Sequence, residues 1–433
     1  MIERIATVAL PLAQEIVVLR RLLHRFGALA PLALVVVTSG AVAQTQLLAP
    51  TEVAAELAYS VALDGSHLAA GAPGALMKSG RVYTYACIGQ SCANAVPLAP
   101  VDLDAGDLFG AAVSLSINTL AVGAPEQGAG AVYVFTHDGA NWSLQQKIVA
   151  APVLPGERFG SSVAVEGDRL AVGAPGANAE AGAVYVFERA GVNWSQSDRL
   201  QATDASSGDA LGSSVALSAD TILTGAPQWA PVLAGAYSRG AAYVFEFVSP
   251  GWMQQARLLP TVAGDGDTFG HAVSLSGDRA VVGAPLADLR VGNAIVFERS
   301  GPVWTQQAQL LAPVGLPGDR FGWSVALDGD QLIVGAPFAL EGCGGSTLFT
   351  RPAGSWVAST DPALSRASPG GLVGWSVATR GQSWLVGIPG YSGAPSHVGA
   401  ALWRDSSDGL FNDGFEKAGI DVCVPPEKRL AAG

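Results

Sequence analysis

Side chains that could perform catalysis are scarce in this sequence. His24 lies in an N-terminal segment that we expect to be removed, and no two of the remaining histidines have metal-ligand spacing. The chain contains no Gly-x-Ser-x-Gly nucleophile motif and no Gly-x-x-x-x-Gly-Lys phosphate loop. We therefore predict no catalytic residue, no metal site and no cofactor. The remaining histidines are His67, His137, His271 and His397.

A position that recurs seven times is a better candidate, because binding requires only a suitable surface. It carries a large ring in four copies and Ala111, Ser161 or Ser213 in three. Aromatic surfaces with a few polar groups bind glycans, peptides and proteins. A long connection, 228–239, adds two further rings. The candidate ligand-binding residues are Tyr59, Trp229, Tyr237, His271, Trp323 and Trp375.

These rings are positioned by an internal repeat of roughly 50 residues. The plainest copy, residues 159–187, starts with Phe159-Gly160 and reaches Gly-Ala-Pro at 173–175. The first copy has Leu57-Ala58 in place of Phe-Gly, and the last has Gly-Ile-Pro at 387–389. The seven glycines that open Gly-Ala-Pro or its equivalent are Gly71, Gly123, Gly173, Gly225, Gly283, Gly335 and Gly387.

Each copy contains four strand candidates. In the sixth copy, 323–327 alternates, a turn follows at 328–330, and 332–334 is a short apolar run. A third strand matches Ala183–Phe187 in the third copy, and a fourth follows a Trp, as in Trp304–Leu311. Four antiparallel strands at this period predict an all-β, seven-bladed β-propeller. The aromatic position would then begin the innermost strand of each blade.

The N-terminus is expected to complete the ring. Residues 46–50 match 309–313, which end a fourth strand, whereas the seventh copy has no fourth strand of its own. An N-terminal strand of the mature chain would close the seventh blade and remove exposed strand edges.

The aromatic rings of the recurring position have an alternative role. They could pack between blades, because they share strand parity with apolar residues such as Val325 and Leu327.

Residues 1–43 are typical of a signal peptide. A basic flank precedes a short apolar run, and Ala41-Val42-Ala43 fits signal peptidase cleavage before Gln44. A membrane anchor is the alternative. We expect a propeller at 44–404, a C-terminal tail of unknown role or a disordered end at 405–433, and no later transmembrane segment. The net charge of −12 argues against nucleic acid as a partner.

The four cysteines lie in the part that we expect to be exported. Cys87 and Cys92 face each other across a predicted hairpin, so a local disulfide is expected in an oxidising compartment. Cys343 and Cys423 remain to pair with each other.

Phe-Gly followed by Gly-Ala-Pro resembles the FG-GAP repeat of integrin α subunits and of many secreted bacterial proteins. The resemblance covers about 44–404 and implies a propeller of seven blades. The family commonly carries a calcium loop, Asp-x-Asp-x-Asp-Gly, which is replaced here by tight turns such as 166–169 and 276–279. Calcium needs six to eight oxygens, so the family's metal sites do not carry over. We interpret Asp102, Asp104 and Asp107 as a solvated turn.

The sequence thus predicts a secreted or periplasmic, monomeric and non-enzymatic propeller. It would act in binding, adhesion or scaffolding for a protein or glycan partner. The alternatives are an enzyme with its active site in the central channel and a structural component of the bacterial cell envelope. A cluster of carboxylates or histidines at the channel mouth would favour the enzyme, and a broad aromatic face without such a cluster would favour binding.

Overall fold

The computed structural model describes residues 45–47 (backbone only), 55–88, 91–93, 95–152, 154–231, 238–359, 370–390 and 399–404. All belong to one compact unit, Val42–Gly433. The predicted boundaries at 43 and 405 lie outside the described residues and stay predictions. Within the described ranges, no helix is long and apolar enough to cross a membrane.

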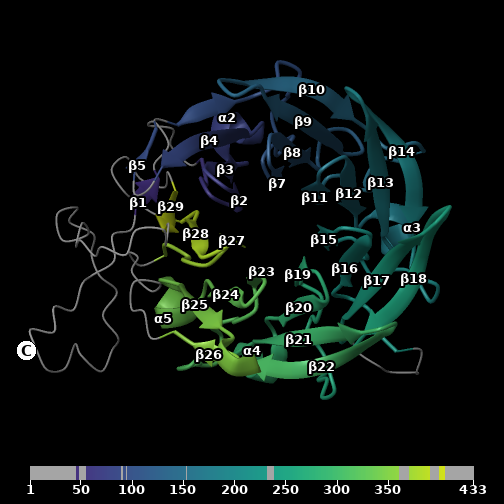
Figure 1. Cartoon of the computed structure of the whole chain (residues 1–433), viewed down its shortest axis with the longest axis vertical. Helices are drawn as coiled ribbons and strands as arrows, with labels where there is room; N and C mark the ends of the chain where they lie inside the picture. Colours follow the sequence, from purple (N-terminus) through teal and green to yellow (C-terminus); the bar gives the residue numbers. More distant parts are fainter. Residues whose placement is uncertain are drawn as a thin grey trace, which may run out of the picture. The chain divides into compact units, whose positions relative to one another are not determined.

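The described residues form seven antiparallel sheets arranged as the blades of a propeller, which confirms the predicted fold (Figure 1). Blades 1 to 3 contain β2 (Ser60–Asp64), β3 (His67–Ala72), β4 (Arg81–Ile88), β5 (Ser91–Cys92) and β6 (Val96–Leu98); β7 (Ala112–Ser116), β8 (Thr119–Ala124), β9 (Ala131–His137) and β10 (Trp142–Ile148); and β11 (Ser162–Glu166), β12 (Arg169–Ala174), β13 (Ala183–Ala190) and β14 (Asn193–Leu200).

Blades 4 to 7 repeat this order. They contain β15 (Ser214–Ser218), β16 (Thr221–Ala226), β17 (Ala241–Val248) and β18 (Gly251–Leu258); β19 (Ala272–Ser276), β20 (Arg279–Ala284), β21 (Asn293–Ser300) and β22 (Val303–Leu310); β23 (Ser324–Asp328), β24 (Gln331–Ala336), β25 (Gly345–Thr350) and β26 (Val357–Ala358); and β27 (Val377–Arg380), β28 (Ser383–Ile388), β29 (Ala400–Arg404) and β1 (Thr45–Leu47). The first strand of each blade lies nearest the centre of the ring (Figure 1).

Short turns join the second and third strands in four blades: α2 (Ala75–Lys78), α3 (Ala177–Glu180), α4 (Ala287–Arg290) and α5 (Ala339–Gly342). Their central residues are left-handed, with φ of 52° at Asn178 and 56° at Ala179 in α3. Left-handed backbone costs about 1–2 kcal/mol per non-glycine residue. A backbone hydrogen bond from Gly182 to the Ala177 carbonyl closes the turn at 2.9 Å. A further turn, η1 (Pro352–Gly354), precedes β26.

The recurring glycines are explained by contact between neighbouring blades. A Cβ atom on Gly173 would lie 2.0 Å from the carbonyl oxygen of Gly212 in the next blade. The Gly-Ala-Pro glycines of the other blades meet the next Phe-Gly glycine in the same way, and Gly387 meets Ala58. The Phe itself belongs to the core, since Phe159 is fully buried and packs edge-on against Tyr185. The repeat signature is therefore a blade–blade junction.

At the other end of the innermost strands, which we call the hairpin face, a ring of polar contacts joins the blades. In six blades the last residue of the innermost strand accepts a backbone hydrogen bond from the hairpin of the following blade. In blade 7, Arg380 instead pairs with Asp64 at 3.4 Å and so links the last blade to the first. The six acceptors are Asp64, Ser116, Glu166, Ser218, Ser276 and Asp328.

Blades 7 and 1 also meet at the opposite end. Leu57 bridges to Gly399, and the Ser376 hydroxyl donates to the Ala58 carbonyl at 2.8 Å. The β1 backbone lies antiparallel beside β29, with Thr45 opposite Trp403. Closure of the ring by the mature N-terminus stays a prediction, because the residues on both sides of β1 lie outside the described ranges.

Candidate binding site: an aromatic arc at one mouth of the channel

Four of the six candidate residues lie together at one mouth of the channel. Each lies one or two residues before an innermost strand, at the end opposite the hairpin face. The ring centroids are 5.5 Å apart between Tyr59 and Trp375, 5.0 Å between Trp375 and Trp323, and 4.4 Å between Trp323 and His271. These four rings, from blades 1, 7, 6 and 5, form what we call the aromatic arc.

Two further residues extend the arc. Phe338 lies 5.5 Å from Trp323 and 6.3 Å from Trp375, and the Arg320 guanidinium lies 4.2 Å from the Phe338 ring. All six side chains are half-buried, so each is packed and also reaches solvent. Sequence reasoning missed Arg320. Its position directly before Phe-Gly was the available signal.

The arc is neutral near pH 7 apart from Arg320. Burial, aided by the Arg320 charge, lowers the pKa of His271, and its hydrogen bond to the Trp323 carbonyl only partly opposes this. Since that carbonyl can only accept, His271 Nδ1 donates to it at 3.0 Å and Nε2 carries the lone pair of the neutral ring. Burial, and then the charge of Glu56, raises the pKa of Tyr59.

The other half of the mouth is small and polar. Ser161 and Ser213 each donate a hydroxyl hydrogen bond to the carbonyl three residues earlier, at 2.8 and 2.7 Å. With Ala111 in blade 2, these residues add no ring to blades 2, 3 and 4 at this position. The mouth is therefore lopsided, with its aromatic surface over blades 5, 6, 7 and 1.

Comparison with protein families matches the FG-GAP repeat in five segments, which together cover more than half of the chain. The chain belongs to the FG-GAP repeat family. The matched segments of this FG-GAP protein are 94–135, 142–187, 194–245, 252–297 and 304–347. Each starts near the outer strand of one blade and ends in the third strand of the next. A search of curated proteins finds no match.

The other candidate residues do not join the arc of this FG-GAP propeller. Trp229 is 7% exposed and lies in the core between blades 3 and 4, where the Arg257 guanidinium stacks 4.7 Å from its ring. Tyr237 lies outside the described residues. An aromatic residue in a long loop suggested an exposed ring, but at Trp229 the ring fills an apolar gap.

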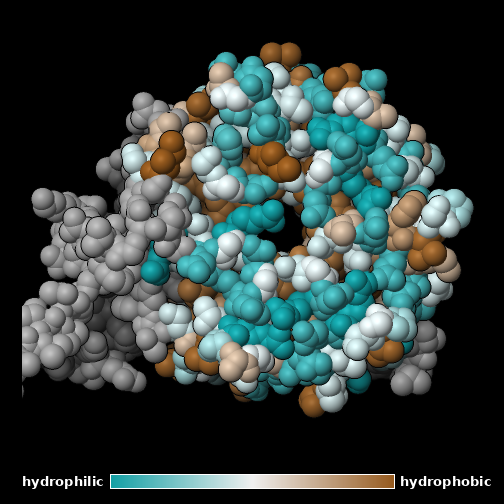
Figure 2. Space-filling view, viewed as in Figure 1, coloured by the Kyte–Doolittle hydropathy of each residue, from teal (hydrophilic) through white to brown (hydrophobic). Residues whose placement is uncertain are grey.

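Below the arc, the innermost strands enclose a channel cavity of about 260 Å³. Figure 2 shows an opening in the middle of the ring, surrounded mainly by hydrophilic and neutral residues. The described residues that line the cavity are Val, Ala, Leu, Ser and Thr. Two of the polar ones serve the scaffold, because Ser114 and Ser274 accept backbone hydrogen bonds from the next blade, each at 3.0 Å.

Asp102 and Asp104 are exposed, as expected for a solvated turn, whereas Asp107 is buried, and the Asp102 and Asp107 carboxylates also make structural contacts. Asp102 pairs with Lys147 at 2.7 Å and accepts a hydrogen bond from Tyr133. Asp107 is only 7% exposed, and its carboxylate accepts a hydrogen bond from the backbone of Asp104 at 2.8 Å. No group of three or more His, Cys, Asp or Glu residues suited to a metal ion occurs among the described residues.

The predicted disulfide between Cys87 and Cys92 is present and joins β4 to β5. Cys343 is buried, whereas Cys423 lies outside the described residues, so their pairing stays a prediction.

Proposed function

We propose that this FG-GAP propeller is an exported, monomeric and non-enzymatic binding protein. Its aromatic arc would bind a protein or glycan partner in adhesion or scaffolding. One observation carries the proposal: four half-buried rings from four successive blades form a continuous contact at the channel mouth. A continuous ring surface buries large apolar area on binding and loses little side-chain entropy.

The rings also pack against one another, so packing and binding have to be separated. Each ring contacts a ring of the neighbouring blade, which supports the junction between those blades. Full burial would account for the rings by packing alone, but all four retain exposed surface. Polar groups at the edge of the arc, the Arg320 guanidinium and the His271 imidazole, can orient a ligand through hydrogen bonds.

Single substitutions test the proposal. Trp323→Ala should weaken binding about 30-fold or more if the ring is a binding hot spot worth at least about 2 kcal/mol. The matched control is Ser161→Ala, at the same repeat position in blade 3, which should bind like the wild type. A printed glycan array and pull-down of purified candidate proteins supply the ligand.

The circular dichroism melting curve of each variant separates the two roles. Lost binding by a variant with wild-type melting supports the proposal. Unchanged binding below the melting transition, together with a large fall in melting temperature, would reduce the arc to packing between blades.

A further inference from the structure

A second cavity lies between blades 6 and 7 on the hairpin face, at the opposite end of the propeller from the arc. It has a volume of about 580 Å³, within the range of small-molecule sites. We call it the blade 6–7 cavity. The lining residues that matter here are Asp330, Gln331, Arg351, Gln382, Trp384 and Arg404.

Two of these residues break the repeat pattern. Trp384 and Arg404 are opposite each other on β28 and β29, where blade 3 pairs Leu170 with Phe187. Blade 7 thus has an arginine where every other blade has a core aromatic residue, and a Trp where they have Leu, Ile or Ala. Those aromatic residues are Tyr85, Phe135, Phe187, Phe245, Phe297 and Phe349. Both departures line the blade 6–7 cavity.

The equivalent cavity between blades 3 and 4 shows what has changed. It measures about 450 Å³, and Arg169 spans it by donating to Asp220 at 2.8 Å and to the Ala219 carbonyl at 2.9 Å. At the blade 6–7 junction, Gln331 replaces the arginine and Gln382 replaces its aspartate. The bridging ion pair is thereby lost. Gln331 instead donates to the Thr379 hydroxyl and the Ser383 carbonyl of blade 7. Gln382 stays exposed at the wall of a larger cavity.

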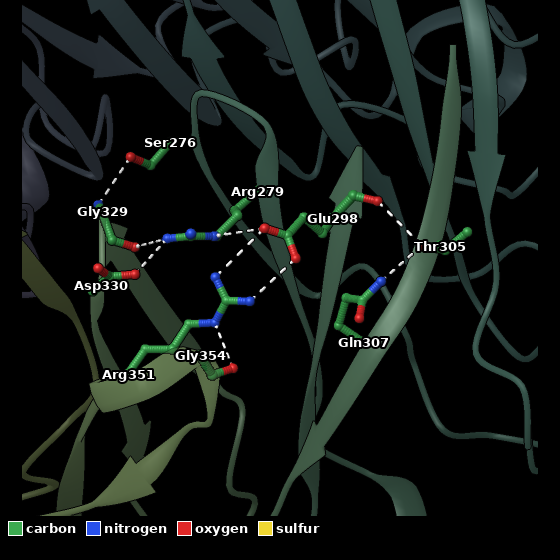
Figure 3. Close-up of polar contacts among 9 residues, drawn as sticks. All are labelled: Ser276, Arg279, Glu298, Thr305, Gln307, Gly329, Asp330, Arg351 and Gly354. Atoms are coloured by element: carbon green, nitrogen blue, oxygen red, sulfur yellow. Dashed lines mark hydrogen bonds and ion pairs between the residues drawn. The ribbon is translucent and has the colours of Figure 1, made fainter. Parts of the chain in front are cut away.

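Two charged side chains of this cavity, Asp330 and Arg351, are already paired within the protein, as Figure 3 shows. Asp330 accepts from Arg279 at 2.7 Å, and Arg351 pairs with Glu298 at 3.2 Å. A strongly charged ligand would have to displace one of these partners. A neutral ligand with many hydroxyl groups would not, because amides, carboxylates and guanidinium groups together offer donors and acceptors.

We propose that the blade 6–7 cavity binds a neutral saccharide unit. This site is separate from the arc, on the opposite face of the ring, and it does not depend on what the arc binds. Gln382 is exposed on the hairpin of blade 7, so its amide is available to sugar hydroxyls and can be replaced without disturbing the core.

Saturation-transfer difference NMR on the full chain tests the site. The probes are glucose, galactose, mannose, N-acetylglucosamine, maltose, cellobiose and lactose at millimolar concentration. We expect at least one sugar to receive saturation, and Gln382→Ala to weaken its binding about three- to tenfold through the loss of one or two hydrogen bonds. Asp220→Ala, the same truncation at the equivalent hairpin of blade 4, should leave binding unchanged.

The arc variant Trp323→Ala should also retain sugar binding. Failure of all seven sugars to bind would overturn the proposal, as would wild-type binding by Gln382→Ala or equal weakening by Asp220→Ala. Loss of sugar binding in Trp323→Ala alone would overturn it too, because it would assign the sugar to the arc.

Discussion

The junction between Gly-Ala-Pro and the next Phe-Gly predicts that Gly173→Ala destabilises the propeller. The new Cβ would lie 2.0 Å from the Gly212 carbonyl oxygen and 2.3 Å from Ser162 Oγ. Both neighbours are held in place, because Ser162 donates to that carbonyl at 2.8 Å. Blades 3 and 4 must therefore move apart, or the hydrogen bond must break.

The expected cost follows from three contributions. Overpacking a tight contact costs about 1–3 kcal/mol, and the lost hydrogen bond about 0.5–1.5 kcal/mol. Replacing glycine by alanine reduces the entropy of the unfolded chain and returns about 0.5–1 kcal/mol. The net destabilisation is about 0.5–4 kcal/mol, centred near 2 kcal/mol. With an unfolding entropy of about 2.1 cal/mol/K per residue over roughly 350 residues, the melting temperature falls by about 1–5 °C, centred near 3 °C.

Thermal unfolding followed by tryptophan fluorescence measures this shift. Gly251→Ala is the matched control, because its new Cβ would meet no atom within 4 Å and its φ is not in the left-handed region. A second variant isolates the hydroxyl: Gly123→Ala makes the same clash with Gly160, but Ala112 replaces the serine there, so it should cost about 1 kcal/mol less. If Gly173→Ala and Gly251→Ala had the same melting temperature, the blade-junction explanation of the repeat would be wrong.

Further substitutions test the ring of hairpin contacts and the arc. Arg380→Ala should cost at most about 1 kcal/mol, because the Arg380 side chain is 59% exposed, although its partner Asp64 is only 14% exposed. Asp64→Ala should cost more, about 1–3 kcal/mol, because it also removes the acceptor for the Ile117 backbone; equal urea midpoints for the two variants would contradict this. The lowered pKa of His271 predicts stability that is complete above about pH 6.5, the usual pKa of histidine, and declines as pH falls from there toward the folded-state pKa. Melting curves from pH 7 to 5 should show a smaller decline for His271→Asn, and an identical decline would refute the assignment.

The fold could be predicted because its signature recurs with regular spacing. Phe-Gly and Gly-Ala-Pro mark the two ends of each junction, so their count gives the number of blades. The physical reason for the glycines could not be predicted, because Gly173 meets Gly212 only after two blades have folded. The exception in the first copy is also explained, since Ala58 adopts a left-handed φ of 65° at the position of the Phe-Gly glycine.

The candidate site could be predicted in part. Comparison of the same position across copies located the arc, because a repeat places equivalent residues at one end of the ring. Arg320 was missed because its role depends on stacking of the guanidinium over Phe338, a contact between side chains that the repeat spacing does not report. Trp229 was expected to be exposed because it lies in a long connection. Its ring instead fills an apolar gap between two blades, which the sequence of the connection does not reveal.

The repeat itself limits where a partner can be recognised. The Phe-Gly and Gly-Ala-Pro glycines, the core Phe and the hairpin acceptors all hold one blade to the next, so changing them weakens the ring. Two positions vary between the copies: the residue after Phe-Gly and the side chains at the start of the second strand. They contact the next blade in some blades but not in all. The aromatic arc occupies the first of these positions in blades 5, 6, 7 and 1. Gln331 and Trp384 line the blade 6–7 cavity from the second, so both candidate sites include positions where the copies differ.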